Sequence, residues 1–530
     1  MTSRAWYGLP PALLFFLLGV RMLPYPGAQY DEVLFASALY PPIAVEHRIG
    51  NLPLMLMTYL GALKAWLFAP VLALFPPNDW TLRLPVLLAG AASVWLFYLA
   101  LQRRIGPAWA LAGSLLLATD AVYITTTVFD WGPVALQHLF FVLALLALVR
   151  YSHDGRARWL FISGLSCGLA LWDKALFLWL LAGFGLALII VFPRPVLAVF
   201  RRKMLISAAA TGFCLGSLPF LMYNVQYPLK TLTANAAVDE QPIDEKIFRP
   251  LESNLAGYSL FGYLARNETR SLPANLTAGE KAVIAVADAL GRPQSGWQLY
   301  LLLLSLPALL FLRGSENFRF ALWAVLGLGL TLSAMAATRG AGASAHHMVL
   351  LWPVPHLIIA LAATAIARRW AGRGSRITAL VLTLGAASNL AVSNQYQAQL
   401  IECGPSTVWT DAIRPLMQSL REYPGRTVLA TEWGILEQIR FYSRGEQATY
   451  YGSDGLIPSL PDPLAARTLE EAMAQAKTIF VGRADGSEIV PDTNAKLNQF
   501  AKDRGYAKQR LRLIEDRHRR AIFEVFEYRK

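Results

Sequence analysis

The sequence predicts a polytopic α-helical membrane protein that ends in a small α/β domain. The chain of 530 residues is 55% hydrophobic and only 16% charged, whereas a soluble domain is about half apolar and about a quarter charged. Apolar runs of roughly 18 to 25 residues, long enough to cross a bilayer as helices, recur from the N-terminus to Val392. The tail, residues 393–530, contains no such run.

The basic residues are distributed in a way that also favours a membrane protein. The net charge of +13 comes largely from Arg and Lys in the short connections between apolar runs, which is typical of cytoplasmic loops. We therefore set aside a nucleic acid as the partner that a basic chain can indicate. The three cysteines, Cys167, Cys214 and Cys403, form no spaced pair, so neither a disulfide framework nor a zinc motif is predicted.

About eleven membrane spans are expected, with the N-terminus inside and the C-terminus outside. With this arrangement each basic connection lies on the cytoplasmic side. A cleaved signal peptide is the alternative for the first apolar run, but the many later spans favour a retained anchor. The expected spans cover residues 6–25, 82–101, 107–125, 132–149, 159–172, 175–192, 204–223, 299–312, 320–337, 348–366 and 377–392.

Two long connections are expected outside the membrane. In the first, residues 26–81, the half-apolar piece from Leu52 to Phe75 predicts amphipathic helices on the membrane surface, because a span here would place every later basic loop outside. The second, residues 224–298, is long enough to be either functional or disordered. Its acidic cluster, residues 239–245, is more simply explained by a solvated loop than by a metal site.

The tail alternates strand-like and helical patterns. Strands are expected over 426–431, 477–482 and 520–528, and helices over 464–475 and 493–504, which is the pattern of a small α/β domain. No glycine-rich phosphate-binding motif occurs in it. We therefore divide the chain into a membrane domain, residues 1–392, and an accessory domain on the outer face, residues 393–530.

The most informative stretch is Gln29-Tyr30-Asp31-Glu32-Val33, just after the first span. Ionisable groups in or beside the membrane are energetically costly and usually have a function. The alternative is that Asp31 and Glu32 only begin a surface helix, where acids favour the helix dipole.

Further charged residues fall at the same end of the predicted spans: Asp130, Asp173, Lys174, Arg339, His346 and His347. Both signs of charge at one membrane face suit a substrate with an anionic head and a lipid tail. A carboxylate can act as a general base on a hydroxyl, and Arg, Lys and His can bind a departing phosphate.

Each of these residues also has a simpler interpretation. Asp130 can cap a helix, Asp173 and Lys174 can form a local ion pair, and the two histidines can be interfacial residues. Asp120, before Asp130, is a reserve candidate that caps a helix or lines a cavity.

These motifs resemble a known family. The Asp-Glu pair, the surface helix expected at Leu52-Pro53-Leu54-Met55, and Leu82-Arg83-Leu84-Pro85 with Leu88-Ala89-Gly90 are similar to the GT-C glycosyltransferases. Within them the chain most resembles the protein O-mannosyltransferases and lipid A aminoarabinose transferases. Phe129-Asp130-Trp131 and the segment from Gly164 to Lys174 fit the same pattern. The likeness is clear to about residue 200, extends to the later spans by topology, and hardly reaches the tail.

The resemblance implies a GT-C fold and an inverting transferase that takes a sugar from a polyprenyl-phosphate carrier at the outer face. Asp31 is then the catalytic carboxylate with Glu32 beside it, and Asp130 a second acid at the acceptor or phosphate side. The implied phosphate contacts are Lys174, Arg339, His346 and His347. Where the aminoarabinose transferases carry a lysine, this chain has Ile49-Gly50-Asn51-Leu52-Pro53, and Arg48 is the candidate substitute.

The implied partners are the lipid-linked sugar donor, a lipid, glycan or protein acceptor, and membrane lipids. The sequence requires no cofactor, and no ligand spacing decides whether a divalent metal is needed. The implied location is a bacterial cytoplasmic (inner) membrane, with the site and the tail facing the periplasm. One alternative is a transporter that flips lipid-linked sugars, although such proteins place charges near the midplane and carry internal repeats, and no convincing repeat occurs here. Another is a structural subunit.

Overall fold

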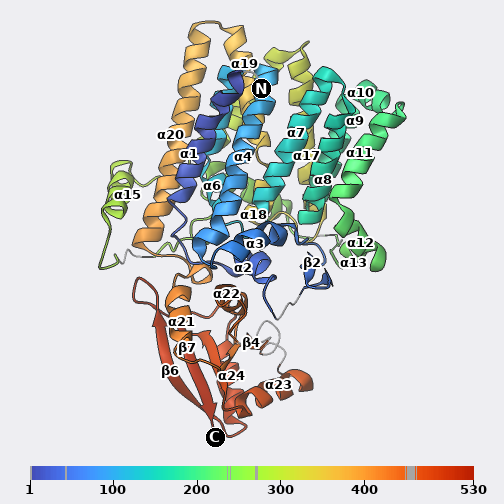
Figure 1. Cartoon of the computed structure of the whole chain (residues 1–530). Helices are drawn as coiled ribbons and strands as arrows, with labels where there is room; N and C mark the ends of the chain where they lie inside the picture. Colours follow the sequence, from blue (N-terminus) through green and yellow to red (C-terminus); the bar gives the residue numbers. More distant parts are fainter. Residues whose placement is uncertain are drawn as a thin grey trace.

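The computed structural model consists of a helical bundle that carries an α/β domain at one end (Figure 1). The structure describes residues 3–41, 45–235, 237–238, 240–268, 272–447, 449–450, 457, 460 and 462–530. The N-terminus lies at the end of the bundle far from the α/β domain (Figure 1).

Apolar helices form the bundle. Within the described residues, five are long and apolar enough to cross a membrane, or eight when each bent pair counts as one. The straight helices are α1 (Leu9–Val20), α4 (Asp79–Ile105), α7 (Val134–Asp154), α8 (Ala157–Asp173), α16 (Gln298–Ala308), α17 (Glu316–Ala337), α19 (Val354–Arg369) and α20 (Arg373–Glu402). The bent pairs are α5 (Pro107–Thr119) with α6 (Ala121–Val128) at 59°, α9 (Phe177–Val191) with α10 (Pro193–Phe200) at 103°, and α11 (Lys203–Gly216) with α12 (Leu218–Gln226) at 70°. Each expected span overlaps one of these helices or pairs, and the straight helices with fewer than 18 residues are α1, α8, α16 and α19.

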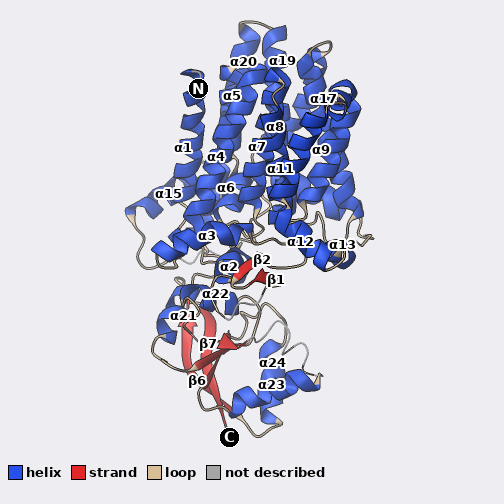
Figure 2. Cartoon of the chain, turned by 45° about the vertical axis from the view of Figure 1, so that its right-hand side comes forward, coloured by secondary structure: helices blue, strands red, loops and turns tan. Residues whose placement is uncertain are grey.

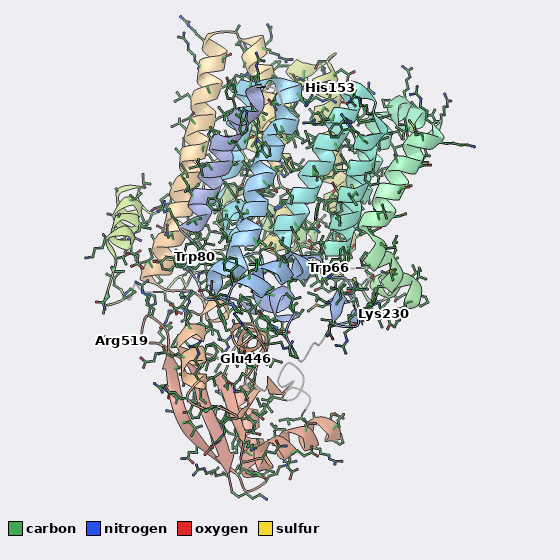
Figure 3. The ribbon with its side chains drawn as sticks, viewed as in Figure 1. Trp66, Trp80, His153, Lys230, Glu446 and Arg519 are labelled. Carbon is green, nitrogen blue, oxygen red and sulfur yellow. The ribbon has the colours of Figure 1, made fainter. Side chains whose placement is uncertain are left out.

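The two ends of the bundle differ in chemistry. Figure 3 shows His153, near the end of α7, at the end away from the α/β domain, and Trp66 and Trp80 at the opposite end. Trp80 is in the first turn of α4, and Arg103 and Arg104 are in its last turn. These arginines therefore lie at the end of the bundle away from the α/β domain, as His153 does. The charge asymmetry in the sequence therefore corresponds to two ends of one bundle.

The first loop differs from the expectation in one respect. It contains α2 (Tyr30–Ser37), a hairpin of β1 (His47–Ile49) and β2 (Leu52–Met55), and α3 (Leu63–Leu74). The surface helix expected at Leu52–Met55 is therefore wrong: this segment is a strand. Gly50 adopts a positive φ of 58°, which permits a tight turn, and Pro53 occupies an edge strand, where its missing N–H is tolerated. Figure 2 shows the hairpin at the junction of the bundle and the α/β domain.

The second loop is built largely of short helices. These are α13 (Lys230–Asn235), a π-helical turn (Asp244–Phe248), α14 (Arg249–Ala256) and α15 (Ala278–Ala289). In the acidic cluster, Asp239 lies outside the described residues, while Asp244 forms an exposed ion pair with Arg249 at 2.7 Å. Across the described part of the chain, no three His, Cys, Asp or Glu side chains gather as a metal ion requires.

The C-terminal domain has a five-stranded sheet with the order β4-β3-β5-β7-β6. Strands β3 (Thr427–Ala430), β4 (Thr449–Tyr450) and β5 (Thr478–Arg483) are parallel, and β7 (Ala521–Arg529) and β6 (Ala507–Glu515) add antiparallel. The helices are α21 (Ile413–Leu420), α22 (Leu436–Tyr442), α23 (Pro463–Ala474) and α24 (Thr493–Lys502). All three expected strands and both expected helices of this domain are confirmed.

Several features of this region were not expected, among them the elements α21, α22 and β4. Helix α20 continues to Glu402, past the boundary placed at residue 392, because polar residues extend the helix beyond its apolar part. Strand β6 was missed because Lys508, Arg510 and Arg512 interrupt its apolar pattern. Charged residues are common on edge strands, where they discourage pairing with other chains.

Candidate functional site

Helix α2 holds Asp31 at its first turn. The Gln29 side-chain oxygen accepts hydrogen bonds from the backbone N–H groups of Asp31 at 2.7 Å and Glu32 at 3.2 Å. The Gln29 N–H in turn donates to the Glu32 carboxylate at 3.2 Å, which completes a capping box. Asp31 and Glu32 therefore begin a helix, as the simpler interpretation predicted, and their backbone orientation is well defined.

A buried ion pair anchors this turn to the bundle. The Arg83 guanidinium contacts both oxygens of Glu32, at 2.6 Å from Nε and 2.9 Å from Nη2. It also donates to the carbonyls of Leu23 at 2.7 Å and Pro26 at 2.9 Å. Arg83 and Glu32 are 0% and 2% exposed, whereas Asp31 remains partly exposed. The two adjacent acids thus differ: Glu32 is enclosed, and Asp31 is accessible.

A second buried ion pair joins α3 to the start of α7. Lys64 Nζ lies 2.9 Å from Asp130 Oδ2 and donates to the Asp130 carbonyl at 2.7 Å. The other carboxylate oxygen of Asp130 accepts from the N–H groups of Val134 and Ala135 at 2.7 and 2.9 Å. Asp130 therefore caps α7 and pairs with a lysine. The only sequence signal for Lys64 was that it is a lone lysine in an apolar segment.

Asp173 and Lys174 lie next to this pair and bond to different partners. Lys174 Nζ donates to the Gly132 carbonyl at 2.9 Å, and Asp173 accepts from Gln137 Nε2 at 3.1 Å. Both side chains are buried. The carboxylates of Asp173, Asp130 and Asp31 all act electrostatically on the Lys174 ammonium, so these charges, distant in sequence, form one cluster.

The two histidines follow α17 on a short helix, α18 (Ala345–Met348). His346 Nδ1 accepts from the Trp131 indole at 3.1 Å, and its ring packs against Gly132. The ring of His347 lies 4.3 Å from that of His346. Both histidines are partly exposed. The structure therefore brings them to the segment that also contains Asp130 and the Lys174 partner Gly132.

The two predicted arginines are less closely connected to the cluster. Arg339, between α17 and α18, and Arg48, on β1, are both exposed. Considering described residues only, neither guanidinium makes a hydrogen bond or an ion pair.

Asp120 lies at the break between α5 and α6 and belongs to a separate network. It accepts from Trp352 Nε1 at 2.7 Å and Gln298 Nε2 at 3.0 Å, and lies 3.3 Å from His356 Nε2. It also caps α6 through the Tyr123 N–H at 2.9 Å. This buried network connects α6, α16 and α19 and explains Asp120 without a catalytic role.

Two tyrosines that sequence analysis did not single out lie within electrostatic reach of Asp31. Burial, and then the Asp31 carboxylate, raise the pKa of Tyr59 and raise that of Tyr263 to about 12. Both phenols consequently keep their proton at neutral pH. They are neutral hydrogen-bond donors near a partly exposed carboxylate.

The C-terminal domain covers α2 from the other side (Figure 1). Helix α22 packs on α2, Gln438 donates to the Ala28 carbonyl, and Ser37 donates to Glu437. Asp31 is therefore positioned between the bundle and the α/β domain.

Comparison with known proteins agrees with this architecture. Residues 61–223 match the family described as dolichyl-phosphate-mannose-protein mannosyltransferase. ArnT from Cupriavidus metallidurans bound to undecaprenyl phosphate has a similar structure, with a TM-score of 0.57 and 13% identity over 98% of this chain and 97% of that one. The fold is that of the GT-C glycosyltransferases.

Two further solved structures are also similar to the chain. The same ArnT in its apo state gives a TM-score of 0.56 and 13% identity over 97% of this chain and 96% of that one. The oligosaccharyltransferase AglB from Archaeoglobus fulgidus, in complex with an inhibitory peptide and a dolichol-phosphate, gives a TM-score of 0.48 and 12% identity over 91% of this chain and 70% of that one. No curated protein matches the chain in sequence. The family match covers Lys64, Asp130 and Lys174 and begins after Asp31.

Proposed function

We propose that this chain is a membrane glycosyltransferase that moves a sugar from a polyprenyl-phosphate carrier to an acceptor hydroxyl. The observation that carries the proposal is Asp31: a partly exposed carboxylate on a capped, anchored helix at one end of an apolar bundle. The Lys174 ammonium and the neutral phenols of Tyr59 and Tyr263 lie within electrostatic reach of the Asp31 carboxylate. The GT-C fold and the description of the matched family support the same activity.

In the proposed reaction, Asp31 acts as the general base. It accepts the proton of the acceptor hydroxyl while the hydroxyl oxygen attacks the anomeric carbon. The bond from that carbon to the phosphate oxygen breaks, and the polyprenyl phosphate leaves with the bonding electrons. Because this is a single displacement, the anomeric configuration inverts.

Glu32 and Asp130 have a different part in this proposal. Both are buried in ion pairs and occupied by backbone hydrogen bonds, so we assign them the positioning of α2, α3 and α7. Asp31 alone among the three is partly exposed, so we assign to it the acceptance of the proton from the acceptor hydroxyl.

Lys174, His346 and His347 are the proposed contacts of the donor phosphate. An ammonium has three N–H donors. Among the described residues Lys174 donates only to the Gly132 carbonyl, which leaves two donors for phosphate oxygens. Arg48 and Arg339 are exposed in connections at the same end of the bundle and have long side chains that can reach a headgroup. We further propose that the end of the bundle that carries Asp31 faces the exterior, because the basic connections expected in the cytoplasm lie at the opposite end of the bundle.

The first test is mass spectrometry of lipid and glycan fractions from cells that carry the wild type, Asp31→Asn, or no copy. A sugar-bearing product is expected mainly with the wild type, since the amide cannot accept the proton; we expect transfer to fall by about 10²- to 10⁴-fold, the usual contribution of a general base. Glu446→Gln, which alters an exposed acid of the C-terminal domain (Figure 3), is the matched control and should transfer normally.

Two outcomes would contradict the proposal. Wild-type turnover in a correctly folded Asp31→Asn protein would remove Asp31 as the base. Identical products in all three strains, with the lipid-linked sugar redistributed across the membrane, would instead favour the transporter.

A further inference from the structure

Two aromatic side chains from opposite ends of the sequence meet beside Asp31. Tyr30 directly precedes Asp31 on α2, and Trp433 follows strand β3 in the C-terminal domain. Their ring centroids lie 5.1 Å apart with the planes tilted by 39°. Both side chains are partly exposed, so ring surface remains available at the turn that carries Asp31.

The position of Trp433 follows from the topology of the domain. It lies just beyond the carboxyl end of β3, a strand that pairs in parallel with β5, and ligands of open α/β sheets bind outside the carboxyl ends of the strands. The preceding residue, Glu432, accepts hydrogen bonds from the N–H groups of Ile489 and Val490. The following helix, α22, docks on α2. The loop is therefore held on both sides of Trp433.

We propose that Trp433 and Tyr30 form a stacking subsite for a sugar ring, so that the C-terminal domain supplies part of the active site. This inference rests on the proposed function. A pyranose presents a face of C–H groups that packs against an aromatic ring, while its hydroxyls project from the edge. Aromatic rings provide large apolar contact area with defined geometry, and the hydroxyls then have Asp31, Tyr59 and Tyr263 as hydrogen-bonding partners.

The subsite has a consequence for specificity. Stacking on a flat ring tolerates different hydroxyl configurations, so the aromatic pair would contribute affinity for a pyranose in general. The bound sugar ring belongs either to the donor or to a sugar on the acceptor, since both substrates must approach Asp31 in the proposed reaction. The experiment has one arm for each source.

The donor arm measures binding to the purified full-length protein in detergent. Undecaprenyl phosphate and mannosyl-phospho-undecaprenol serve as probes, because they share the lipid and the phosphate and only the second carries a sugar. Trp433→Ala is expected to weaken binding of the mannosylated lipid by about tenfold, the size of a lost aromatic contact, and to change binding of undecaprenyl phosphate by less than about twofold. Trp433→Phe should keep most of the affinity, since a ring remains.

The acceptor arm measures sugar transfer in the presence of free methyl α-mannoside. If the ring belongs to the acceptor, methyl α-mannoside inhibits the wild type by competition, and Trp433→Ala needs about tenfold more for the same inhibition. Trp370→Ala is the matched control for both arms, because Trp370 is 50% exposed and lies in the α19–α20 connection at the far end of the bundle (Figure 1).

The outcomes separate the two proposals. If the wild type transfers sugar, and Trp433→Ala equals it both in affinity for the mannosylated lipid and in inhibition by methyl α-mannoside, the subsite is wrong and the proposed function stands. If the wild type transfers no sugar, the proposed function fails, and the donor arm then decides whether Trp433 and Tyr30 bind the sugar of a lipid-linked donor; equal binding of the mannosylated lipid by the wild type and Trp433→Ala would overturn the subsite. Should Trp433→Ala fail to fold, Trp433→Leu provides the aliphatic comparison with Trp433→Phe, and equal sugar affinity of these two would overturn stacking.

Discussion

At the scale of single residues, the position of Asp31 depends on the buried ion pair of Arg83 and Glu32. The Arg83 side chain has five N–H donors, and its acceptors are the two Glu32 oxygens and the carbonyls of Leu23, Pro26 and Gly27. Removing one partner of a buried pair leaves an uncompensated charge, which costs roughly 3–5 kcal/mol, whereas replacing both partners by apolar residues is often tolerated. Arg83 thus holds the start of α2 in place.

We expect Arg83→Met to lower the unfolding temperature strongly, because Glu32 remains buried without its partner. The double substitution Arg83→Met with Glu32→Leu should recover much of that stability. It should not recover transfer, since the turn that carries Asp31 has lost its anchor. Thermal unfolding in detergent, paired with a transfer assay, tests both expectations. A double variant with full activity would show that the ion pair does not position Asp31.

At the scale of secondary-structure elements, α8 and α11 approach closely through glycines. A Cβ added at Gly164 or Gly168 of α8, or at Gly212 or Gly216 of α11, would overlap a backbone carbonyl of the facing helix. Small residues at a four-residue spacing permit such close packing between membrane helices. The segment from Gly164 to Lys174 is part of the resemblance to the GT-C glycosyltransferases, and the structure adds a packing reason for its glycines. This packing positions the end of α8, where Asp173 and Lys174 lie.

Gly168→Ala is expected to destabilise the protein by about 1–3 kcal/mol, the usual cost of overpacking. Gly185→Ala in α9 is the matched control, because a Cβ there meets nothing within 4 Å and alanine favours a helix over glycine. The measurement is thermal unfolding followed by size-exclusion chromatography in detergent. Equal unfolding temperatures for the two variants would contradict the close packing of α8 and α11.

At the scale of the whole molecule, one polar junction connects three distant segments. Glu280 of α15 accepts hydrogen bonds from Tyr25, which follows α1, and from Arg517, which lies in the β6–β7 connection. Burial by itself raises the pKa of Glu280, but the hydrogen bonds from Arg517, Tyr25 and Thr277 outweigh it and lower the pKa to about 2. The ionised carboxylate therefore stabilises the contact between the bundle, the second loop and the C-terminal domain.

This junction gives a pH dependence with a definite sign. Because the pKa of Glu280 is lower in the folded state than its ordinary value of 4.5, its stabilisation is fully present above about pH 4.5 and is lost as the pH falls toward 2. We expect the wild type to unfold at a higher temperature than Glu280→Gln at pH 7, and the difference to vanish on acidification through this range. A difference that is constant between pH 7 and pH 3 would contradict the assignment.

The sequence by itself determined the class of the molecule and the region of the site. Apolar runs, basic connections and the pattern of the tail are local properties, so they predicted the helices, the α/β domain and one end where Asp31, Asp130, Lys174 and the histidines gather. The segment Leu52–Met55 was assigned to the wrong element because a turn at Gly50 outweighs its apolar composition.

Only the tertiary structure decided which charges pair and which carboxylate stays accessible. Glu32 and Arg83 are 51 positions apart, Lys64 and Asp130 are 66 apart, and Trp433 reaches Tyr30 from another domain. Such contacts depend on how helices pack and where the C-terminal domain docks. No local pattern records that geometry, because a buried lysine and an exposed one have the same sequence signature. The adjacent acids Asp31 and Glu32 therefore became distinguishable only once Arg83 was placed beside one of them.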